Sequence, residues 1–182
     1  MVHRECLEKK VFHIYNIIML LFHGSNLIVK NPSLKLSRKS LDFGPGFYTT
    51  ENKKQAIDFS YKVAVRKKQE NQIVSIYNYD EQAAQCVLNI LKFHIPDKSW
   101  LDYVHQNRNG LYSGTQYDIV TGPVANDDVY ATLLIYEQGI LSIEQTLETL
   151  KIKKMYNQFV FKTDKALSFL KFSNYLDLRE LP

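Results

Sequence analysis

The alternation of apolar and polar residues along the chain predicts a series of short strands. Apolar runs rich in β-branched and aromatic residues, bounded by glycine, proline or polar residues, are typical of strands. Such runs cover residues 17–22, 46–50, 72–79, 117–124 and 158–161.

Helical spacing of apolar residues predicts helices between these runs. The helix after residue 52 has one inward face, formed by Ala56, Phe59, Ser60 and Val63. Thr50 or Asn52 can cap its start, and Gln55 stands where a capping box places its return bond. Further helices are expected over residues 82–91 and 98–108, from 126 to 139, and from 142 onward. Because strands and helices are mixed without strict alternation, we expect an α+β fold in a single domain.

The size and composition of the chain favour one folded domain. With 182 residues, of which 45% are hydrophobic and 23% charged, the chain can bury its own core and is neither disordered nor membrane-embedded. A net charge of +4 and a pI near 8.9 indicate a mildly basic surface. Such a surface tolerates nucleic acid or phosphorylated ligands without requiring either.

The N-terminal region contains an apolar run over residues 11–22. This run is too short to span a bilayer, and no small-residue cleavage site follows it, so we expect neither export nor a membrane partner. We expect the core domain to cover residues 19–182, with residues 1–18 as an N-terminal extension outside that core. Met19 is an alternative start of the chain.

The cysteines and histidines do not predict a metal site. Cys6 and Cys86 match no disulfide framework and no metal-ligand spacing, so a cytoplasmic location is the default expectation. The five histidines include no pair at ligand spacing: His3, His13, His23, His94 and His105.

Three separated segments combine residues suited to binding a flat polar ring. They are His-Gly-Ser at residues 23–25, Phe-Gly-Pro-Gly-Phe-Tyr at residues 43–48, and Tyr-Asn-Gln-Phe-Val-Phe at residues 156–161. In the second segment, two glycines allow a tight turn directly before a strand. Taken singly, each segment has a simpler interpretation, as a turn, a loop and an ordinary strand.

Together, in this order, the three segments resemble the motifs of the ADP-ribosyltransferase superfamily. The resemblance is to the histidine-tyrosine-glutamate branch, shared by diphtheria toxin and the poly(ADP-ribose) polymerases. Residues 46–53 are similar to the diphtheria-toxin segment, and Phe59 follows Tyr48 by eleven positions, where that family places a second stacking ring. The third segment is similar to the asparagine-glutamate-aromatic strand of the polymerases, with Gln158 in place of the glutamate. The resemblance spans residues 19–172, and the chain looks like an uncharacterised family of small bacterial proteins within this superfamily.

The resemblance implies a split β-sheet flanked by helices, with NAD as substrate and mono-ADP-ribosyl transfer as the activity. His23, Tyr48 and Gln158 are then the catalytic residues by position. His23 would bond the adenosine ribose, Gly24 would place its bare backbone against the nicotinamide carboxamide, and Gln158 would bond the 2′-hydroxyl of the nicotinamide ribose. Tyr48 and Phe59 would sandwich the nicotinamide ring. The full set of NAD-binding residues is His23, Gly24, Ser25, Tyr48, Phe59 and Arg38.

Gln158 departs from the family pattern, because an amide offers only a dipole where a carboxylate would stabilise an oxocarbenium-like state. We expect activity to be slow, altered in acceptor or absent, and we expect no polymer. The acceptor is a protein, a nucleic acid or, in an NAD glycohydrolase, water. Two other classes stay open: an inactive module that binds NAD or ADP-ribose, and a nucleic-acid-binding domain with stacking aromatics. The resemblance also suggests a toxin, held silent by an inhibitor or antitoxin protein.

Several charged residues are weaker candidates. Substitute carboxylates, if Gln158 is misassigned, are Asp127, Asp128 and then Glu137, although Asn126, Asp127 and Asp128 are expected to cap a helix. The cations Lys35, Arg38 and Lys39 can meet a pyrophosphate or lie in a solvated loop. The cations Lys151, Lys153 and Lys154 can guide an acidic acceptor or form a solvated face.

Overall fold

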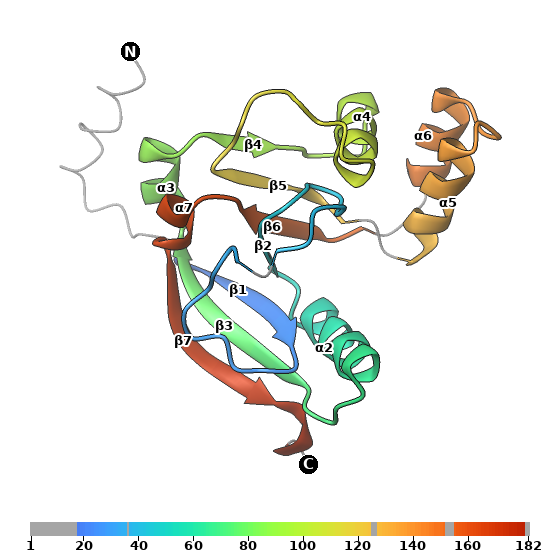
Figure 1. Cartoon of the computed structure of the whole chain (residues 1–182). Helices are drawn as coiled ribbons and strands as arrows, with labels where there is room; N and C mark the ends of the chain where they lie inside the picture. The colour runs from blue at the N-terminus through green and yellow to red at the C-terminus, as the bar shows by residue number, and fades with distance from the viewer. Residues whose placement is uncertain (1–17, 36, 125–126, 152–154, 181–182) are drawn as a thin grey trace.

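The computed structural model describes residues 18–35, 37–124, 127–151 and 155–180. In this part of the chain, seven strands form one mixed sheet in the order β4-β5-β6-β2-β1-β3-β7, accompanied by six α-helices (Figure 1). The strands are β1 Ile18–Ser25, β2 Phe47–Thr50, β3 Ile73–Asp80, β4 Ile90–Lys92, β5 Ile119–Pro123, β6 Asn157–Phe161 and β7 Leu170–Asp177. β4 and β5 run parallel, whereas the other neighbours run antiparallel. The protein is therefore a single mixed domain of helices and strands.

The sheet divides into two groups of strands that share one residue pair. β1 pairs with β3 along all eight of its residues, and β2 pairs with β6 along all four. Between β1 and β2, by contrast, the pairing consists of Phe22 opposite Thr50, which we call the junction. Figure 1 shows β4, β5, β6 and β2 in the upper group and β1, β3 and β7 in the lower group.

Side-chain caps define where several helices begin. The helices are α2 Lys53–Lys67, α3 Glu81–Val87, α4 Lys98–Arg108, α5 Asp127–Glu137, α6 Ile143–Lys151 and α7 Asp164–Leu167, and a 3-10 turn, η1 Leu178–Glu180, follows β7. The prediction that Asn52 can cap the first of these is confirmed, because its Oδ1 accepts a hydrogen bond from the N–H of Gln55 at 3.0 Å. The expected return bond of Gln55 is replaced by another contact, because its Oε1 accepts from the hydroxyl of Thr50 at 2.7 Å.

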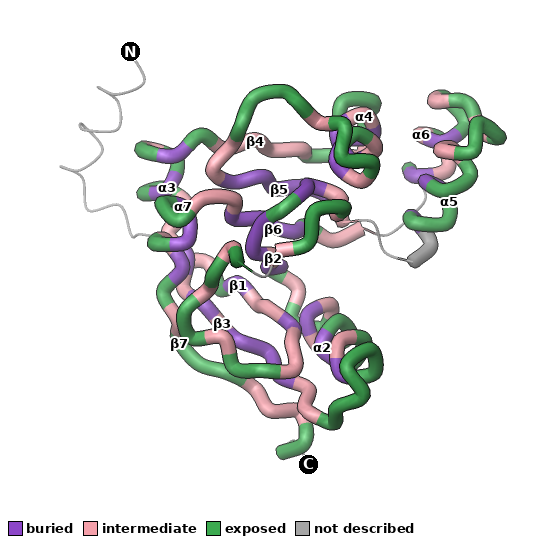
Figure 2. The backbone as a smooth tube through the Cα atoms, in the orientation of Figure 1, coloured by how far each residue is buried: buried purple, intermediate pink, exposed green. Residues whose placement is uncertain are grey.

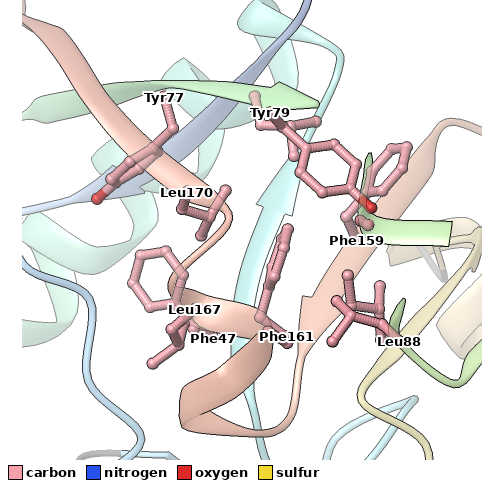
Figure 3. Close-up of a cluster of buried hydrophobic side chains, with 12 residues drawn as sticks. Phe47, Tyr77, Tyr79, Leu88, Phe159, Phe161, Leu167 and Leu170 are labelled. Carbon is pink, nitrogen blue, oxygen red and sulfur yellow. The ribbon is translucent and has the colours of Figure 1, made fainter. Parts of the chain in front are cut away.

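The alternation of side chains along the strands produces two hydrophobic cores on opposite faces of the sheet. On β6, Phe159 and Phe161 belong to the first core, whereas Val160 belongs to the second. The first core also includes Phe47, Tyr77, Tyr79, Leu88, Leu167 and Leu170 (Figure 3). The second core lies between the sheet and α4, α5 and α6, and its members include Phe43, Trp100, Leu101, Val120, Val129, Leu133 and Leu150. In Figure 2, β5 and β6 are largely buried, whereas much of α2 is exposed.

The structure differs from the predicted elements at three places. The prediction that Phe59 faces inward is wrong: its side chain is 47% exposed, and the buried residues of α2 are Ala56, Ser60 and Ala64. The helix expected over residues 82–91 ends at Val87, since Leu88 has extended backbone angles and Ile90–Lys92 form β4. The strand β7 was not predicted.

The predicted N-terminal extension falls almost entirely outside the described residues. Residues 1–17 are not described, and Ile18 is the first residue of β1, opposite Asp80 on β3. Among the helices of the described ranges, none combines the length and apolar character that a membrane crossing requires.

Candidate functional site

His23 lies on β1, one residue past the junction, and reaches the neighbouring strand. Its Nδ1 atom is 2.7 Å from the carbonyl oxygen of Tyr48, and its ring stacks on that of Phe47 with 4.4 Å between centroids. Burial lowers the pKa of the imidazole from its ordinary value of 6.5. Because a carbonyl oxygen only accepts hydrogen bonds, Nδ1 carries the proton and Nε2 of the neutral ring is an acceptor.

Gly24 is where α2 approaches β1 most closely. A Cβ atom at this position would lie 2.0 Å from the carbonyl oxygen of Ala56 and 2.9 Å from the backbone nitrogen of Ser60. The helix packing alone therefore requires glycine here, and the predicted contact of Gly24 with a nicotinamide carboxamide remains a prediction. Ser25, the last residue of β1, is half-buried opposite Ile73.

Tyr48 is fixed by the turn that precedes its own strand. Its hydroxyl donates to the carbonyl of Gly44 at 2.6 Å and accepts from the N–H of Phe43 at 3.3 Å. The turn depends on Gly44, whose φ of +73° lies in the left-handed region. Burial, together with the negative charge of Asp42, raises the pKa of Tyr48 well above its usual value, so the phenol stays protonated.

Lys162, a residue that the sequence analysis did not single out, supports the same turn from β6. Its Nζ donates to the carbonyl oxygen of Phe43, and burial lowers its pKa to about 8. A lone lysine after a strand carries no sequence signal for such a role, because the contact joins segments more than 100 residues apart.

Gln158 is the most unusual polar residue of the site. Its residue exposure is 5%, and its Nε2 atom has no hydrogen-bond partner in the described part of the chain. On β6 it lies opposite Thr50 of β2 and Gly122 of β5. Buried amide groups are nearly always paired, because an unmade hydrogen bond costs about 1–3 kcal/mol. The hydroxyl of Tyr103 is also buried without a partner, so the described residues contain two such polar atoms.

The three predicted catalytic residues come from three neighbouring strands, but their side chains do not share one face. Tyr48 is opposite Val160, two positions from Gln158, so these two side chains leave the same face of the sheet. Tyr48 packs against the second core, whereas His23 stacks on Phe47 of the first core. The imidazole of His23 reaches the strand of Tyr48 through its hydrogen bond to the Tyr48 carbonyl, and Tyr48 in turn lies on the strand next to that of Gln158.

Glu51 is a carboxylate beside Asn157, the residue before Gln158, that the sequence analysis did not propose as a site residue. It follows β2 directly, and its Oε1 accepts a hydrogen bond from Nδ2 of Asn157 at 3.3 Å. The Thr50 hydroxyl oxygen also lies 2.9 Å from the carbonyl oxygen of Asn157, so its one proton is shared between this carbonyl and Oε1 of Gln55 where the two strands end. The signal that could have found Glu51 is the strand pairing itself, which places residue 51 beside residue 157.

The remaining predicted NAD contacts are exposed. Phe59 lies on α2 with the guanidinium of Arg66 5.5 Å from its ring centroid. Arg38 is exposed in the connection between β1 and β2. Phe59 is one helical turn after Gln55, which contacts Thr50, so Phe59 lies on the side of α2 that begins next to β2.

Comparison with known proteins adds a family assignment. A family model for DUF3990, described as a protein of unknown function, matches residues 19–172. The chain belongs to the DUF3990 family. No curated protein matches it.

Two cavities of this DUF3990 chain lie away from the predicted site. Both are beside α7 and the start of β7, both include Ser168 and Lys171, and neither is lined by a predicted site residue. Within the described ranges, no three His, Cys, Asp or Glu side chains group as metal ligands.

The weaker candidates of the DUF3990 chain separate into two groups. Glu137 is partnered, because its Oε1 lies 3.8 Å from Nε of Arg108 and 3.6 Å from Nδ1 of His105. Lys35 and Lys39 are exposed, as is Lys151. Other candidates lie outside the described residues: Asn126, Lys153 and Lys154, with the side chains of Asp127 and Asp128. The expectation that Cys86 takes part in no disulfide is wrong, because Cys86 is disulfide-bonded.

Proposed function

We propose that this DUF3990 chain is an NAD-dependent mono-ADP-ribosyltransferase whose reaction centre lies at Gln158. The observation that carries the proposal is the buried, unpartnered Nε2 of Gln158, on the same sheet face as Tyr48. A ribose 2′-hydroxyl is a hydrogen-bond acceptor of the kind this donor lacks. The motif resemblance around His23, Tyr48 and Gln158 supports the same choice of ligand.

The proposed reaction breaks the bond between C1′ of the nicotinamide ribose and the nicotinamide nitrogen. Nicotinamide leaves with the electron pair, an acceptor oxygen or nitrogen bonds to C1′, and the acceptor gives up its proton to solvent. The motif resemblance assigns Nε2 of His23 to a hydroxyl of the adenosine ribose, and Tyr48 and Phe59 to the nicotinamide ring. Because His23 and Tyr48 lie on opposite faces of the sheet, NAD would have to pass around the junction to meet both. Gly24 and Ser25 contact the nicotinamide end, and Arg38 contacts the pyrophosphate.

The carboxylate that directly follows Thr50, the residue opposite Gln158, belongs to Glu51, and we propose it as the source of the negative charge that Gln158 lacks. A carboxylate close to C1′ stabilises the positive charge of the oxocarbenium-like state. The Glu51 carboxylate is bonded to Asn157, whose side chain leaves the opposite face of β6 from that of Gln158, so it would have to leave Asn157 to approach C1′. Replacing Glu51 by glutamine is then expected to lower turnover by about 10²-fold. The matched control is Glu70→Gln, which neutralises another exposed carboxylate.

The direct test is incubation of the purified full chain with NAD, followed by chromatographic measurement of nicotinamide release. We expect release from the wild-type protein and its loss in His23→Ala and Gln158→Ala. The matched controls His94→Ala and Gln138→Ala remove the same residue types from exposed positions. Circular dichroism confirms that each variant is folded. If the site variants and their controls release nicotinamide equally, the reaction does not take place at this site.

A second candidate, NAD binding without turnover, is favoured by one observation: the residue at the predicted catalytic position is an amide. Calorimetric titration with NAD separates it from the enzyme. NAD binding that is lost in Gln158→Ala, with no nicotinamide release in the presence of protein, nucleic acid or water alone, would select the binding module.

A further inference from the structure

The positive charge of the chain is concentrated on α2. Between Lys53 and Lys68 the sequence contains six of the 23 Lys and Arg residues but only one of the 19 Asp and Glu residues. The rest of the chain therefore carries 17 cations against 18 carboxylates, a net charge of −1 compared with +5 for this segment. The mildly basic character of the whole protein comes from one helix.

The cations of α2 lie beside exposed flat or apolar side chains. Tyr61 and Val65 are each 58% exposed, and they are neighbours on the helix because they are four residues apart. We define the basic face of α2 by five exposed residues, Lys54, Tyr61, Lys62, Val65 and Arg66, among which the carboxylate of Asp58 is also exposed. Arg66 is held in place, since its Nε donates to the carbonyl of Lys62 at 3.2 Å and its guanidinium lies over Phe59.

This basic face extends from the proposed reaction centre. Gln55 in the first turn of α2 contacts Thr50, and Thr50 lies opposite Gln158 in the sheet. Phe59, Lys62 and Arg66 follow Gln55 at helical spacing and continue along the same side of the helix. At Gly24 the backbone of α2 packs directly on β1, with no side chain between them. This contact fixes the position of α2 relative to the junction.

We infer that the basic face of α2 binds a single-stranded nucleic acid and presents it as the acceptor for ADP-ribose; the acceptor role rests on the proposed function, whereas the binding does not. Lysine and arginine side chains match the phosphates, and the exposed tyrosine ring on the same helix matches an unpaired base. An acidic peptide would use the cations but has no requirement for the ring. A duplex hides its base faces and would use the cations alone.

The charge test measures anisotropy of a fluorescein-labelled single-stranded oligonucleotide of about 20 nucleotides with the full chain, over a range of salt concentrations. Lys62→Gln with Arg66→Gln should weaken binding about tenfold and reduce the salt slope by about 1.4, because each phosphate contact on a single strand contributes about 0.7. The matched control, Lys30→Gln with Lys171→Gln, removes two exposed cations that lie outside α2 and should bind like the wild type.

The aromatic test compares Tyr61→Ala with Tyr175→Ala, an exposed tyrosine on β7. The first substitution should weaken single-strand binding at least fivefold and the second should not.

Three results would each overturn the inference: equal binding of a duplex, of polyglutamate or of anionic lipid vesicles; unchanged binding in the α2 variants; or equal losses in both tyrosine variants. Nicotinamide release from NAD alone is measured in parallel. Release without oligonucleotide binding refutes only this inference. Binding without release refutes the reaction and with it the acceptor role, but leaves the nucleic-acid binding in place.

Discussion

The Nδ1 atom of His23 lies 2.7 Å from the carbonyl oxygen of Tyr48, where β1 and β2 have ceased to pair. This hydrogen bond therefore links the two groups of strands next to their single shared pair. It also sets the tautomer of the imidazole, because the carbonyl requires a protonated Nδ1. One contact thus combines a structural task with the presentation of Nε2 as an acceptor.

The lowered pKa of His23 predicts a loss of stability in mild acid. The ring binds a proton less readily in the folded protein than in the unfolded chain, where its pKa is near 6.5. The neutral His23 ring therefore contributes its full share to the free energy of unfolding above pH 6.5. This share is lost as the pH falls below that value. Thermal unfolding measured between about pH 5 and 8 should show this dependence. The His23→Gln variant should lack it, and His94→Gln, at an exposed position, should retain it. A His23→Gln variant with the wild-type profile would contradict the assignment.

Gly24→Ala should destabilise the fold, because the new Cβ would lie 2.0 Å from the carbonyl oxygen of Ala56. Crowding of this kind typically costs about 1–3 kcal/mol. Urea denaturation gives the free energy of unfolding. Gly110→Ala is the comparison, because a Cβ there meets nothing within 4 Å and only the φ of +68° is strained. If Gly24→Ala costs no more than Gly110→Ala, α2 does not pack as described.

Gln158→Met should raise the free energy of unfolding while it abolishes NAD binding. Methionine fills a similar volume and removes a buried donor that has no partner, so a gain of about 1 kcal/mol is expected. Chemical denaturation measures the stability, and calorimetry measures binding. Gln138→Met, at an exposed position, should change neither quantity. A clear destabilisation by Gln158→Met would mean that the amide is satisfied within the protein.

Tyr48→Phe should cost about 1–2 kcal/mol of stability, because Gly44 loses the donor to its carbonyl and the N–H of Phe43 loses its acceptor. The ring is kept, so stacking on a nicotinamide is retained and the loss reports the turn alone. Tyr175→Phe on β7 is the control and should stay within about 0.5 kcal/mol of the wild type. Equal stabilities for the two variants would show that the turn does not depend on the phenol.

Local sequence patterns predicted the elements with strong periodicity. The helix expected over residues 98–108 is α4, with Trp100, Tyr103 and Val104 buried. The strand β7 escaped prediction because it is an edge strand whose residues 173–175 are exposed, which removes the alternation that marks a half-buried strand. Phe59 was assigned to the core because an apolar residue at helical spacing normally points inward. Phe59 instead lies on the outer side of α2, with the guanidinium of Arg66 5.5 Å from its ring centroid, which spacing alone does not reveal.

The candidate site was predictable only as far as its segments. The order and composition of the motifs indicated that residues 23, 48 and 158 belong together, and the strands that carry them are neighbours. The face on which each side chain emerges follows from the register of the strands, which no local pattern contains. For the same reason Glu51 and Lys162 were missed, since their contacts join segments more than 100 residues apart.

The order in which the strands leave the ribosome has a consequence for biosynthesis. β6 and β7 come last in the chain, yet one completes the upper group of strands and the other the lower. Neither group can have all of its strands paired before residue 157 has been synthesised. Gln158 is made as part of β6, the strand that completes the upper group. A nascent or truncated chain would consequently lack both a finished sheet and the residue on which the proposed chemistry depends, so the proposed activity would begin only when synthesis of the domain is complete.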